Sequence, residues 1–477
     1  MTRRSLLDMD PEEFRAAGHR LVDQIADFYH ALPQAKLTPG ESPAAVREAL
    51  GNGSLPETGE PNSAITEQAW QLLQNHSLHN GHPLFAGYVT SSAAPIGALA
   101  DLMAAAVNPN VGAWILGPMG TEIEAQSIRW IADFLGYSTN CGGILVSGGN
   151  MANFVGFLAA RAQACKAIRA EGTQAAQLVA YASRETHTWI QKAADLFGLG
   201  TNAIRWIATD QHQRMDPAAL SAQIAADRAN GLQPFFLAAS AGTVSTGAVD
   251  PIRALAQIAQ TERIWFHIDG AYGAPAAALP DADEDLKSLH LADSLAVDPH
   301  KWFYAPLEAG CALIKNAQHL PDAFDYSPAY YHFEADAGLN YYQHGPQNSR
   351  GLRALKVWMG LKATGRQGLI QTIAEDISLA RQLFEEVQKY PELEALTTSL
   401  SITTFRYNPP GTADPNTVNE RLLDRIQKSG ELFLSNAIID GKFALRACIV
   451  NFRTQPRHIA EIPKIVLRLA GMAQPAI

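Results

Sequence analysis

The feature that most constrains this chain is a repeated alternation of short apolar runs and amphipathic segments between about residues 85 and 370. The runs have the length and composition of buried β-strands, and the segments between them carry apolar residues at helical spacing. Their sequences are GGILVSG, LVAYAS, AIRWIAT, FFLAAS, IWFHID, SLAVD and GCALIK. This alternation is typical of a mostly parallel sheet with helices on both faces, so the sequence predicts an α/β fold here.

The regions on either side do not follow this pattern. At the N-terminus, Asp10 precedes a proline and two glutamates, which predicts a helix start, and apolar residues then follow at helical spacing on one face. The segment from Leu37 to Asn62, rich in proline, glycine and glutamate, is expected to be an extended crossing. We therefore expect an N-terminal helical segment over residues 1–85, followed by a large domain over 86–370.

The C-terminal region predicts a smaller α+β unit over residues 371–477. Its expected elements are a helix from Ile373 to Tyr390, the strand-like runs LSITTFRY and FALRACIVNF, and a last helix that ends at about Met472.

Composition excludes several classes of partner. The chain has 37 basic and 47 acidic residues and a net charge of -10, without a dense basic face, so nucleic acid is not expected to bind. The longest apolar run, Ala93 to Val107, is shorter than the roughly 20 residues of a membrane-spanning helix, and no membrane partner is expected. The cysteines lie far apart without metal-ligand spacing, which favours a reduced, cytoplasmic compartment and no metal site; they are Cys141, Cys165, Cys311 and Cys448.

Polar motifs follow several of the predicted strands, at the sheet edge where open α/β sheets bind ligands. In Ser147-Gly-Gly-Asn150 a strand passes into a helix, and the free amides of a helix start favour an anion such as phosphate. The motif matches neither a Walker A loop nor GxGxxG, so an ordinary tight turn remains an alternative.

Three further residues have both an ordinary and a chemical explanation. Asp269 closes the strand IWFHID, either as a helix cap or to hold a proton on a heterocyclic nitrogen. His187 lies at the start of a helix, where a capping or core histidine is common, and Thr243 lies in a Gly/Ser/Thr turn that alone would be a simple loop.

The stretch SLAVDPHKWFYAPLEAG is apolar at both ends, yet His300 and Lys301 lie in its middle. A lysine is rarely buried without a partner, so Lys301 either extends its amine to water or has a chemical task. A phosphate-binding turn, an acid for a ring nitrogen, a histidine that stacks on a ring and a lysine that forms a Schiff base are together the parts of a pyridoxal-phosphate site.

The order of these motifs resembles the group II PLP-dependent amino-acid decarboxylases, the family that includes aromatic-L-amino-acid, glutamate and histidine decarboxylases. The resemblance covers nearly the whole chain and includes HPLFAGY, TEIEAQSIRWIADFLGY, SRGLRALKVW and LRACIVNFRT; DPHKW beside HIDGAYG is its most specific part. It implies the aspartate-aminotransferase-like (type I) fold, with a mostly parallel sheet in the large domain and a small C-terminal α+β domain. It also implies a homodimer with sites at the interface, in which the N-terminal helical segment packs on the partner subunit.

The resemblance implies roles for individual residues. Lys301 would carry the cofactor covalently, Asp269 would keep the pyridine nitrogen protonated, and His187 would stack on the ring. Other positions that match the family's cofactor contacts are Gly149, Asn150, Thr243, Ala271 and His300, with Ser349 reaching the phosphate of the partner subunit.

The activity implied is decarboxylation of an L-amino acid to the amine and carbon dioxide. In the family, a tyrosine of a mobile loop donates the proton, and Tyr330 in SPAYYH matches it, with Tyr331 as a competing match. Relatives with phenylalanine at that position form an aldehyde instead, so Tyr330 favours simple decarboxylation. An aldehyde synthase is one alternative, and an aminotransferase, for which Arg446 offers a carboxylate clamp, is another.

The resemblance indicates the substrate less directly than the reaction. Aromatic-specific relatives carry aromatic pocket residues at positions that here hold Gly81, Val89 and Gly112, while Tyr88 and Thr90 remain as candidate substrate-binding residues. Loss of this apolar surface would admit a bulkier aromatic such as an indole, unless a neighbouring loop fills the space. An aromatic amino acid is the expected substrate, and a non-aromatic amino acid is the alternative.

Overall fold

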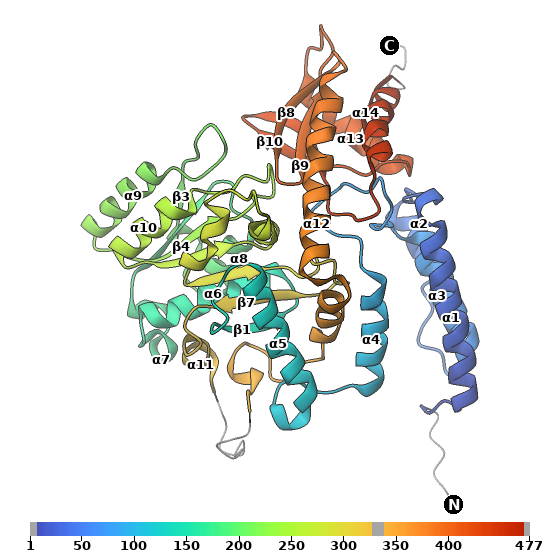
Figure 1. The fold of residues 1–477 in the computed structure, drawn as a ribbon, viewed down its shortest axis with the longest axis horizontal. Coiled ribbons are helices and arrows are strands. Elements are labelled where there is room, and N and C mark those ends of the chain that lie inside the picture. The colour runs from blue at the N-terminus through green and yellow to red at the C-terminus, as the bar shows by residue number, and fades with distance from the viewer. Residues whose placement is uncertain (1–6, 327–337, 472–477) are drawn as a thin grey trace, which may run out of the picture.

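The computed structural model describes residues 7–326 and 338–471 (Figure 1). Its large sheet has seven strands in the spatial order β1-β7-β6-β5-β4-β2-β3. They are β1 (Gly142–Val146), β2 (Leu178–Ser183), β3 (Ile204–Ile207), β4 (Gln233–Ser240), β5 (Trp265–Asp269), β6 (Ser294–Val297) and β7 (Gly310–Ile314). Each predicted run forms one strand, so the mostly parallel α/β sheet is confirmed. Only β7 among them runs opposite to the other six strands, and it pairs antiparallel with β1 and β6.

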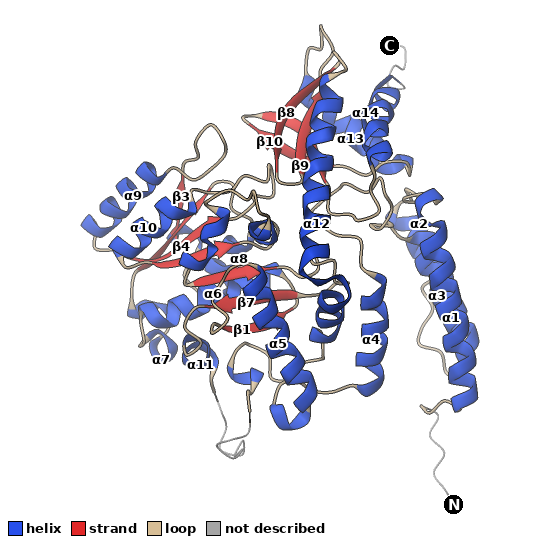
Figure 2. Cartoon of the chain, viewed as in Figure 1, coloured by secondary structure: helices blue, strands red, loops and turns tan. Residues whose placement is uncertain are grey.

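Helices cover both faces of this sheet (Figure 2). Along β4, Phe236 and Ala238 pack against α6 and α8, while Leu237 and Ala239 belong to the core that includes α9 and α10 on the other face. Alternate residues of a strand point to opposite faces, which is why this strand is apolar throughout. The helices are α5 (Pro118–Phe134), α6 (Gly149–Ala164), α7 (Ile168–Glu171), α8 (Trp189–Leu196), α9 (Pro217–Ala229), α10 (Ile252–Glu262) and α11 (His319–Phe324).

The C-terminal part contains a second, antiparallel sheet of four strands in the order β10-β11-β9-β8. The two strand-like runs form β9 and β11, as predicted, whereas β8, β10 and α13 were not predicted. The bounds are β8 (Leu393–Ser399), β9 (Ile402–Tyr407), β10 (Ser435–Ile439), β11 (Lys442–Cys448), α13 (Pro415–Ser429) and α14 (Pro456–Gly471).

A long helix, α12 (Ala354–Gln388), joins the two sheets. It contacts α4 and α5 of the large domain and also β8 and β9 of the small one. The predicted start at Ile373 is therefore wrong, because the helix begins nineteen residues earlier. Gly365, with φ of 68°, interrupts its helical geometry, and this glycine obscured the continuity of the helix in the sequence.

The N-terminal region contains α1 (Pro11–Ala31), α2 (Pro43–Leu50) and α3 (Asn62–His76), and α4 (Pro95–Val107) follows at the start of the large domain. Asp10 caps α1 through its side chain, as predicted. The expected extended crossing is wrong in its centre, because Ser42 caps α2 by accepting a hydrogen bond from the Ala45 amide, and Pro43 begins the helix. Within the described ranges, no helix is both long and apolar enough to cross a membrane.

Short 3-10 turns complete the chain. They are η1 (Leu32–Gln34), η2 (Trp114–Leu116), η3 (Thr173–Ala175), η4 (Thr201–Ala203), η5 (Ala274–Ala278), η6 (Leu286–Leu291) and η7 (Tyr341–Gln343).

Candidate active site

Eight of the nine residues predicted to contact the cofactor line one cavity of about 170 Å³. They come from segments that follow β1, β2, β4, β5 and β6, so the sheet edge brings together motifs that lie far apart in the chain. The eight are Gly149, Asn150, His187, Thr243, Asp269, Ala271, His300 and Lys301.

Lys301 is paired inside this cavity. Its Nζ lies 3.0 Å from Oδ2 of Asp298, a carboxylate that is 2% exposed, and Nε2 of His300 lies 3.7 Å from the same oxygen. Burial lowers the pKa of His300, while the charge of Asp298 raises it. Asp298 was missed in the sequence, although its place in DPHK, three residues before the lysine, was the available signal. Its second oxygen, Oδ1, has no hydrogen-bond partner among the described residues and can accept from a ligand or water.

Asp269 ends β5 and is buried, with both carboxylate oxygens held. Oδ2 accepts a hydrogen bond from Nε1 of Trp189 at 2.8 Å, and Oδ1 accepts one from the Ala271 amide at 3.1 Å. Trp189 was also missed, because the contact joins residues eighty positions apart. The two bonds fix the direction in which this carboxylate faces the cavity.

His187 lies just before α8, on the turn that also supplies Trp189. The Trp189 amide donates a hydrogen bond to Nδ1 of His187 at 3.3 Å, so the neutral ring carries its proton on Nε2. Loss of hydration lowers the pKa of the imidazole, and the neighbouring carboxylate of Asp269 acts in the opposite direction. A ring with a lowered pKa is neutral over a wider pH range, which suits it to stack on a flat ligand.

The loop after β4 carries Thr243 and is held by the small domain. Oγ1 of Thr243 accepts a hydrogen bond from the Ala248 amide at 3.1 Å, and Ser399 donates from Oγ to the Gly247 carbonyl at 3.0 Å. Gly247 has φ of +77°, and a Cβ there would collide with the Ser399 carbonyl, so glycine is required. The small domain thus shapes one wall of the cavity.

Arg446, the arginine considered as a clamp for a substrate carboxylate, is buried and already engaged. Its Nε donates to Oγ of Ser435 at 2.9 Å, and a terminal nitrogen donates to the Val244 carbonyl in the Thr243 loop. The structure therefore gives this arginine a role in supporting the loop.

The groups of the cavity fit pyridoxal phosphate. An amine is available for the aldehyde, a fixed carboxylate for the ring nitrogen, and the N-terminus of α6 for the phosphate. At Gly149, the first residue of α6, a Cβ would lie 2.8 Å from Oδ2 of Asp298, so only glycine leaves the backbone accessible there. In the part of the chain that the structure describes, no group of three or more His, Cys, Asp or Glu side chains is arranged to hold a metal ion.

Comparison with known proteins leads to the same chemistry. Residues 43–408 match the family model described as the pyridoxal-dependent decarboxylase conserved domain. The chain belongs to this decarboxylase family. Its cofactor is pyridoxal 5'-phosphate, which supplies an electron sink when it is bound, and the protein is a carboxy-lyase for amino acids.

Relatives resemble this decarboxylase over its whole length. Aromatic-L-amino-acid decarboxylase from Bacillus atrophaeus is 33% identical over 471 residues, which cover 97% of each chain. Phenylacetaldehyde synthase from Arabidopsis thaliana is 30% identical, over 97% of this chain and 96% of its own. The crystal structure of Oryza sativa TDC with PLP and tryptamine superposes with a TM-score of 0.91 at 25% identity, over 99% of this chain and 100% of that one.

Three predicted site residues do not line this cavity, and a fourth lies outside the described residues. Tyr88 is 56% exposed, with its ring 6.2 Å from that of Phe433, and Thr90 is partly buried elsewhere. Ser349 is exposed. Tyr330, like its competitor Tyr331, lies in residues 327–337, outside the described residues.

The three positions that lack an aromatic residue differ in their surroundings. Val89 lines the cavity directly. At Gly81 a Cβ would lie 3.0 Å from the Leu32 side chain, and at Gly112 it would collide with the Asn348 carbonyl. Neighbouring segments therefore occupy the space beside both glycines. The sequence had left open whether a neighbouring loop fills this space.

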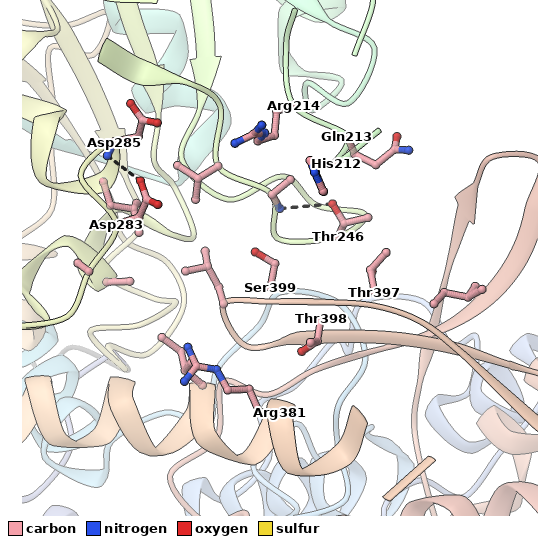
Figure 3. A pocket seen from close by; sticks show the side chains of 18 of the residues that line it. His212, Gln213, Arg214, Thr246, Asp283, Asp285, Arg381, Thr397, Thr398 and Ser399 are labelled. Carbon is pink, nitrogen blue, oxygen red and sulfur yellow. Dashed lines mark hydrogen bonds between the residues drawn. The ribbon is translucent and has the colours of Figure 1, made fainter. Parts of the chain in front are cut away.

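A larger cavity of about 850 Å³ lies between the large and small domains (Figure 3). None of the predicted site residues that the structure describes lines it, but Thr246 does, and this residue belongs to the loop that carries Thr243. Opposite it lie Ser399 at the end of β8 and Arg381 on α12. The same loop therefore borders both cavities.

Proposed function

We propose that this decarboxylase converts an aromatic L-amino acid to the corresponding amine and carbon dioxide. The observation that carries the reaction type is the meeting of Lys301, Asp269 and His187 in one cavity. The aromatic class is supported by the relative from Bacillus atrophaeus and by the tryptamine in the rice structure.

The proposed roles follow from the contacts. Lys301 carries the cofactor and exchanges it for the substrate amine, and Asp298 holds the Lys301 amine in the cavity through their 3.0 Å ion pair. Asp269, fixed by Trp189, keeps a proton on the ring nitrogen. His187 covers the ring, Ala271 leaves room beneath it, and Thr243 lies beside the cofactor. The phosphate is contacted by Gly149, Asn150 and His300. Tyr88 and Thr90 are retained as substrate contacts.

The direct test is incubation of the purified protein and pyridoxal phosphate with a panel of L-amino acids, including aromatic, acidic and aliphatic ones. We expect carbon dioxide and amine in equal amounts from tryptophan, tyrosine or phenylalanine. Turnover of acidic or aliphatic amino acids alone would contradict the aromatic class. A keto acid formed in step with a second keto-acid substrate would instead indicate an aminotransferase.

We propose Tyr330 as the proton donor, and the second candidate function depends on it. The similarity to phenylacetaldehyde synthase keeps aldehyde formation as an alternative. In air-saturated buffer, Tyr330→Phe should divert product from amine to aldehyde and ammonia, with dissolved dioxygen as the two-electron oxidant reduced to hydrogen peroxide; the products are measured by chromatography, with Tyr331→Phe as the matched control. Amine as the sole product of Tyr330→Phe would exclude Tyr330 from this role, and aldehyde from the wild type would favour the synthase.

We also propose a homodimer with sites at the interface. α1 has no buried residue in the single chain, although it is 21 residues long. α4, η2 and the first turn of α5 expose a further set of large apolar side chains, namely Leu99, Leu102, Met103, Val107, Ile115, Leu116 and Met119. A patch of this kind normally marks an interface, and in it the exposed Ser349 would reach the cofactor of the partner. Light scattering should give a molecular mass of twice the 51.5 kDa of one chain. Leu102→Glu should lower the measured mass to that of one chain.

The division into residues 1–85, 86–370 and 371–477 is retained as a proposal, with α12 crossing the last boundary. A cytoplasmic location is supported by the cysteines, all four of which are free.

A further inference from the structure

A buried carboxylate lies behind the lysine, on α12 and outside the set of residues that line the cavity. Oδ2 of Asp376 accepts a hydrogen bond from Nε1 of Trp302 at 2.9 Å and another from the hydroxyl of Tyr304. Both donors belong to the turn that carries Lys301, one and three positions after it. One carboxylate therefore fixes two side chains of this turn.

The turn itself is compact and includes an unfavourable backbone conformation. The Lys301 amide donates to the Asp298 carbonyl at 2.9 Å, and the Tyr304 amide donates to the Lys301 carbonyl at 3.0 Å. Tyr304 has φ of +55°, in the left-handed region that residues with a Cβ rarely adopt. Such a conformation persists only where surrounding contacts hold it, and the bond from Tyr304 to Asp376 is one of these contacts.

The two donors also connect the turn to the small domain. The ring of Trp302 stacks on Tyr272, with centroids 4.7 Å apart, and the Tyr272 hydroxyl accepts a hydrogen bond from the Ser401 amide at 2.9 Å. Tyr304 packs edge-on against Phe452, with centroids 5.5 Å apart. Because Tyr272 lines the cavity and Ser401 links β8 to β9, the turn, the cavity wall and the small domain form one packed unit around Asp376.

Asp376 is the group of this unit that changes charge near neutral pH. Burial raises the pKa of its carboxyl to about 7, the charge of the neighbouring Glu375 adds to this, and the bonds from Tyr304, Trp302 and the Asn451 backbone oppose it. The other titratable groups facing it in the described residues stay neutral there, because burial raises the pKa of Tyr272 and Tyr304 well above the ordinary value and that of Cys448 to about 11.

We propose that Asp376 is a positioning residue of the decarboxylation: through Trp302 and Tyr304 it holds the turn that presents Lys301 to the cofactor and couples that turn to α12. An ionised carboxylate is a stronger acceptor than a protonated one. The hydrogen bonds from Trp302 and Tyr304 that position Lys301 are therefore strongest above about pH 7, and they weaken as the pH falls below this value. This inference depends on the proposed role of Lys301, which the Lys301→Ala variant tests separately.

The experiment compares wild type, Asp376→Asn and the matched control Glu375→Gln, which removes the same charge from the exposed neighbour on α12. Each cofactor-free protein is titrated with pyridoxal phosphate between pH 6 and 8.5, and binding is followed by visible absorbance. In Asp376→Asn we expect the dissociation constant to rise about tenfold at pH 8.5, as for loss of a charged hydrogen bond, and to approach the wild-type value at pH 6. kcat should fall while KM for the amino acid stays within about twofold. Glu375→Gln should follow wild type in kcat and KM, and its pH dependence of cofactor binding should move slightly to lower pH, because the Glu375 charge no longer raises the pKa of Asp376.

Two outcomes would overturn the proposal. One is an Asp376→Asn protein with wild-type cofactor affinity, kcat and pH dependence and only a lower melting temperature, because the role would then be purely structural. The other is a change in KM alone. If Asp376→Asn does not fold, Tyr304→Phe keeps the carboxylate and the ring and removes one donor. It should raise the cofactor dissociation constant about threefold at pH 8.5, and an unchanged value would equally contradict the proposal.

Discussion

Two cavities of this decarboxylase share one loop and differ in almost every other property. The smaller one, of about 170 Å³, holds acidic and cationic groups that are fixed by partners, as Asp269 is by Trp189 and Lys301 by Asp298. The larger one, of about 850 Å³, is lined partly by exposed side chains such as Arg381 (Figure 3) and partly by paired but half-exposed ones such as Arg214, which forms an ion pair with Asp210. Volume therefore does not locate the chemistry. The buried ionic groups of the smaller cavity do, because catalysis needs charges that are already oriented and shielded from water.

The loop over residues 242–248 is where the two cavities meet. Gly242, Thr243 and Val244 face the smaller cavity, and Thr246 and Ala248 face the larger one. Substitutions in the smaller cavity, in this loop and in the larger cavity should accordingly have large, intermediate and negligible effects on activity.

The largest effect is expected from Lys301→Ala, which removes the only amine among the residues that line the smaller cavity. Activity, measured as carbon dioxide release, should fall by roughly 10³-fold or more, because a covalent attachment point is lost. The visible absorbance band of the bound cofactor should disappear. Lys464→Ala, at an exposed lysine on α14, is the control and should keep both. Identical spectra for wild type and Lys301→Ala would contradict the assignment of this cavity as the cofactor-binding active site.

Asp269→Asn should have the next largest effect. It keeps the shape of the side chain but removes the charge that stabilises a protonated ring nitrogen, so kcat should fall by about 10- to 1,000-fold. Trp189→Phe leaves the carboxylate and removes one donor to it, and about a tenfold loss is expected. The prediction requires that Asp269→Asn lose more activity than Trp189→Phe. A larger loss from Trp189→Phe would mean that the indole contributes mainly to packing.

Gly247→Ala tests the shared loop. A side chain at φ of +77° is strained and collides with Ser399, so the free energy of unfolding should fall by about 1–3 kcal/mol. Because the displaced loop carries Thr243, cofactor affinity should fall several-fold as well. Urea unfolding and a cofactor titration measure the two effects. Gly231→Ala, at a similarly positive φ with no close neighbour, controls for backbone strain alone and should leave cofactor affinity unchanged.

The smallest effect is expected in the larger cavity. Arg381→Ala removes an exposed side chain that is not among the residues lining the smaller cavity, so kcat/KM should change by less than about twofold and stability by less than about 0.5 kcal/mol. A steady-state assay with the preferred amino acid decides this. A tenfold loss of kcat/KM would show that the larger cavity takes part in the reaction, and it would contradict the difference in function between the two cavities.

The sequence predicted the large sheet better than the small one for a physical reason. Strands covered on both faces are continuous apolar runs, which are visible without a partner, and all five residues of β1 and all six of β2 are buried. β10, with alternating buried and exposed residues, and β8, mostly half-buried, carry weaker signals. α12 was found only in part, because Gly365 interrupts its pattern.

For the site, the sequence by itself determined the set of chemical groups: the lysine, the acid, the histidine and the glycine-rich turn each follow a strand, and their order identifies the family. The tertiary structure decided which partners fix them. Trp189 reaches Asp269, the small domain supports the Thr243 loop, and Asp376 lies behind the turn of Lys301. These contacts join positions that are dozens of residues apart, and only the packing of helices onto the sheet makes them neighbours, so no local pattern in the chain can record them.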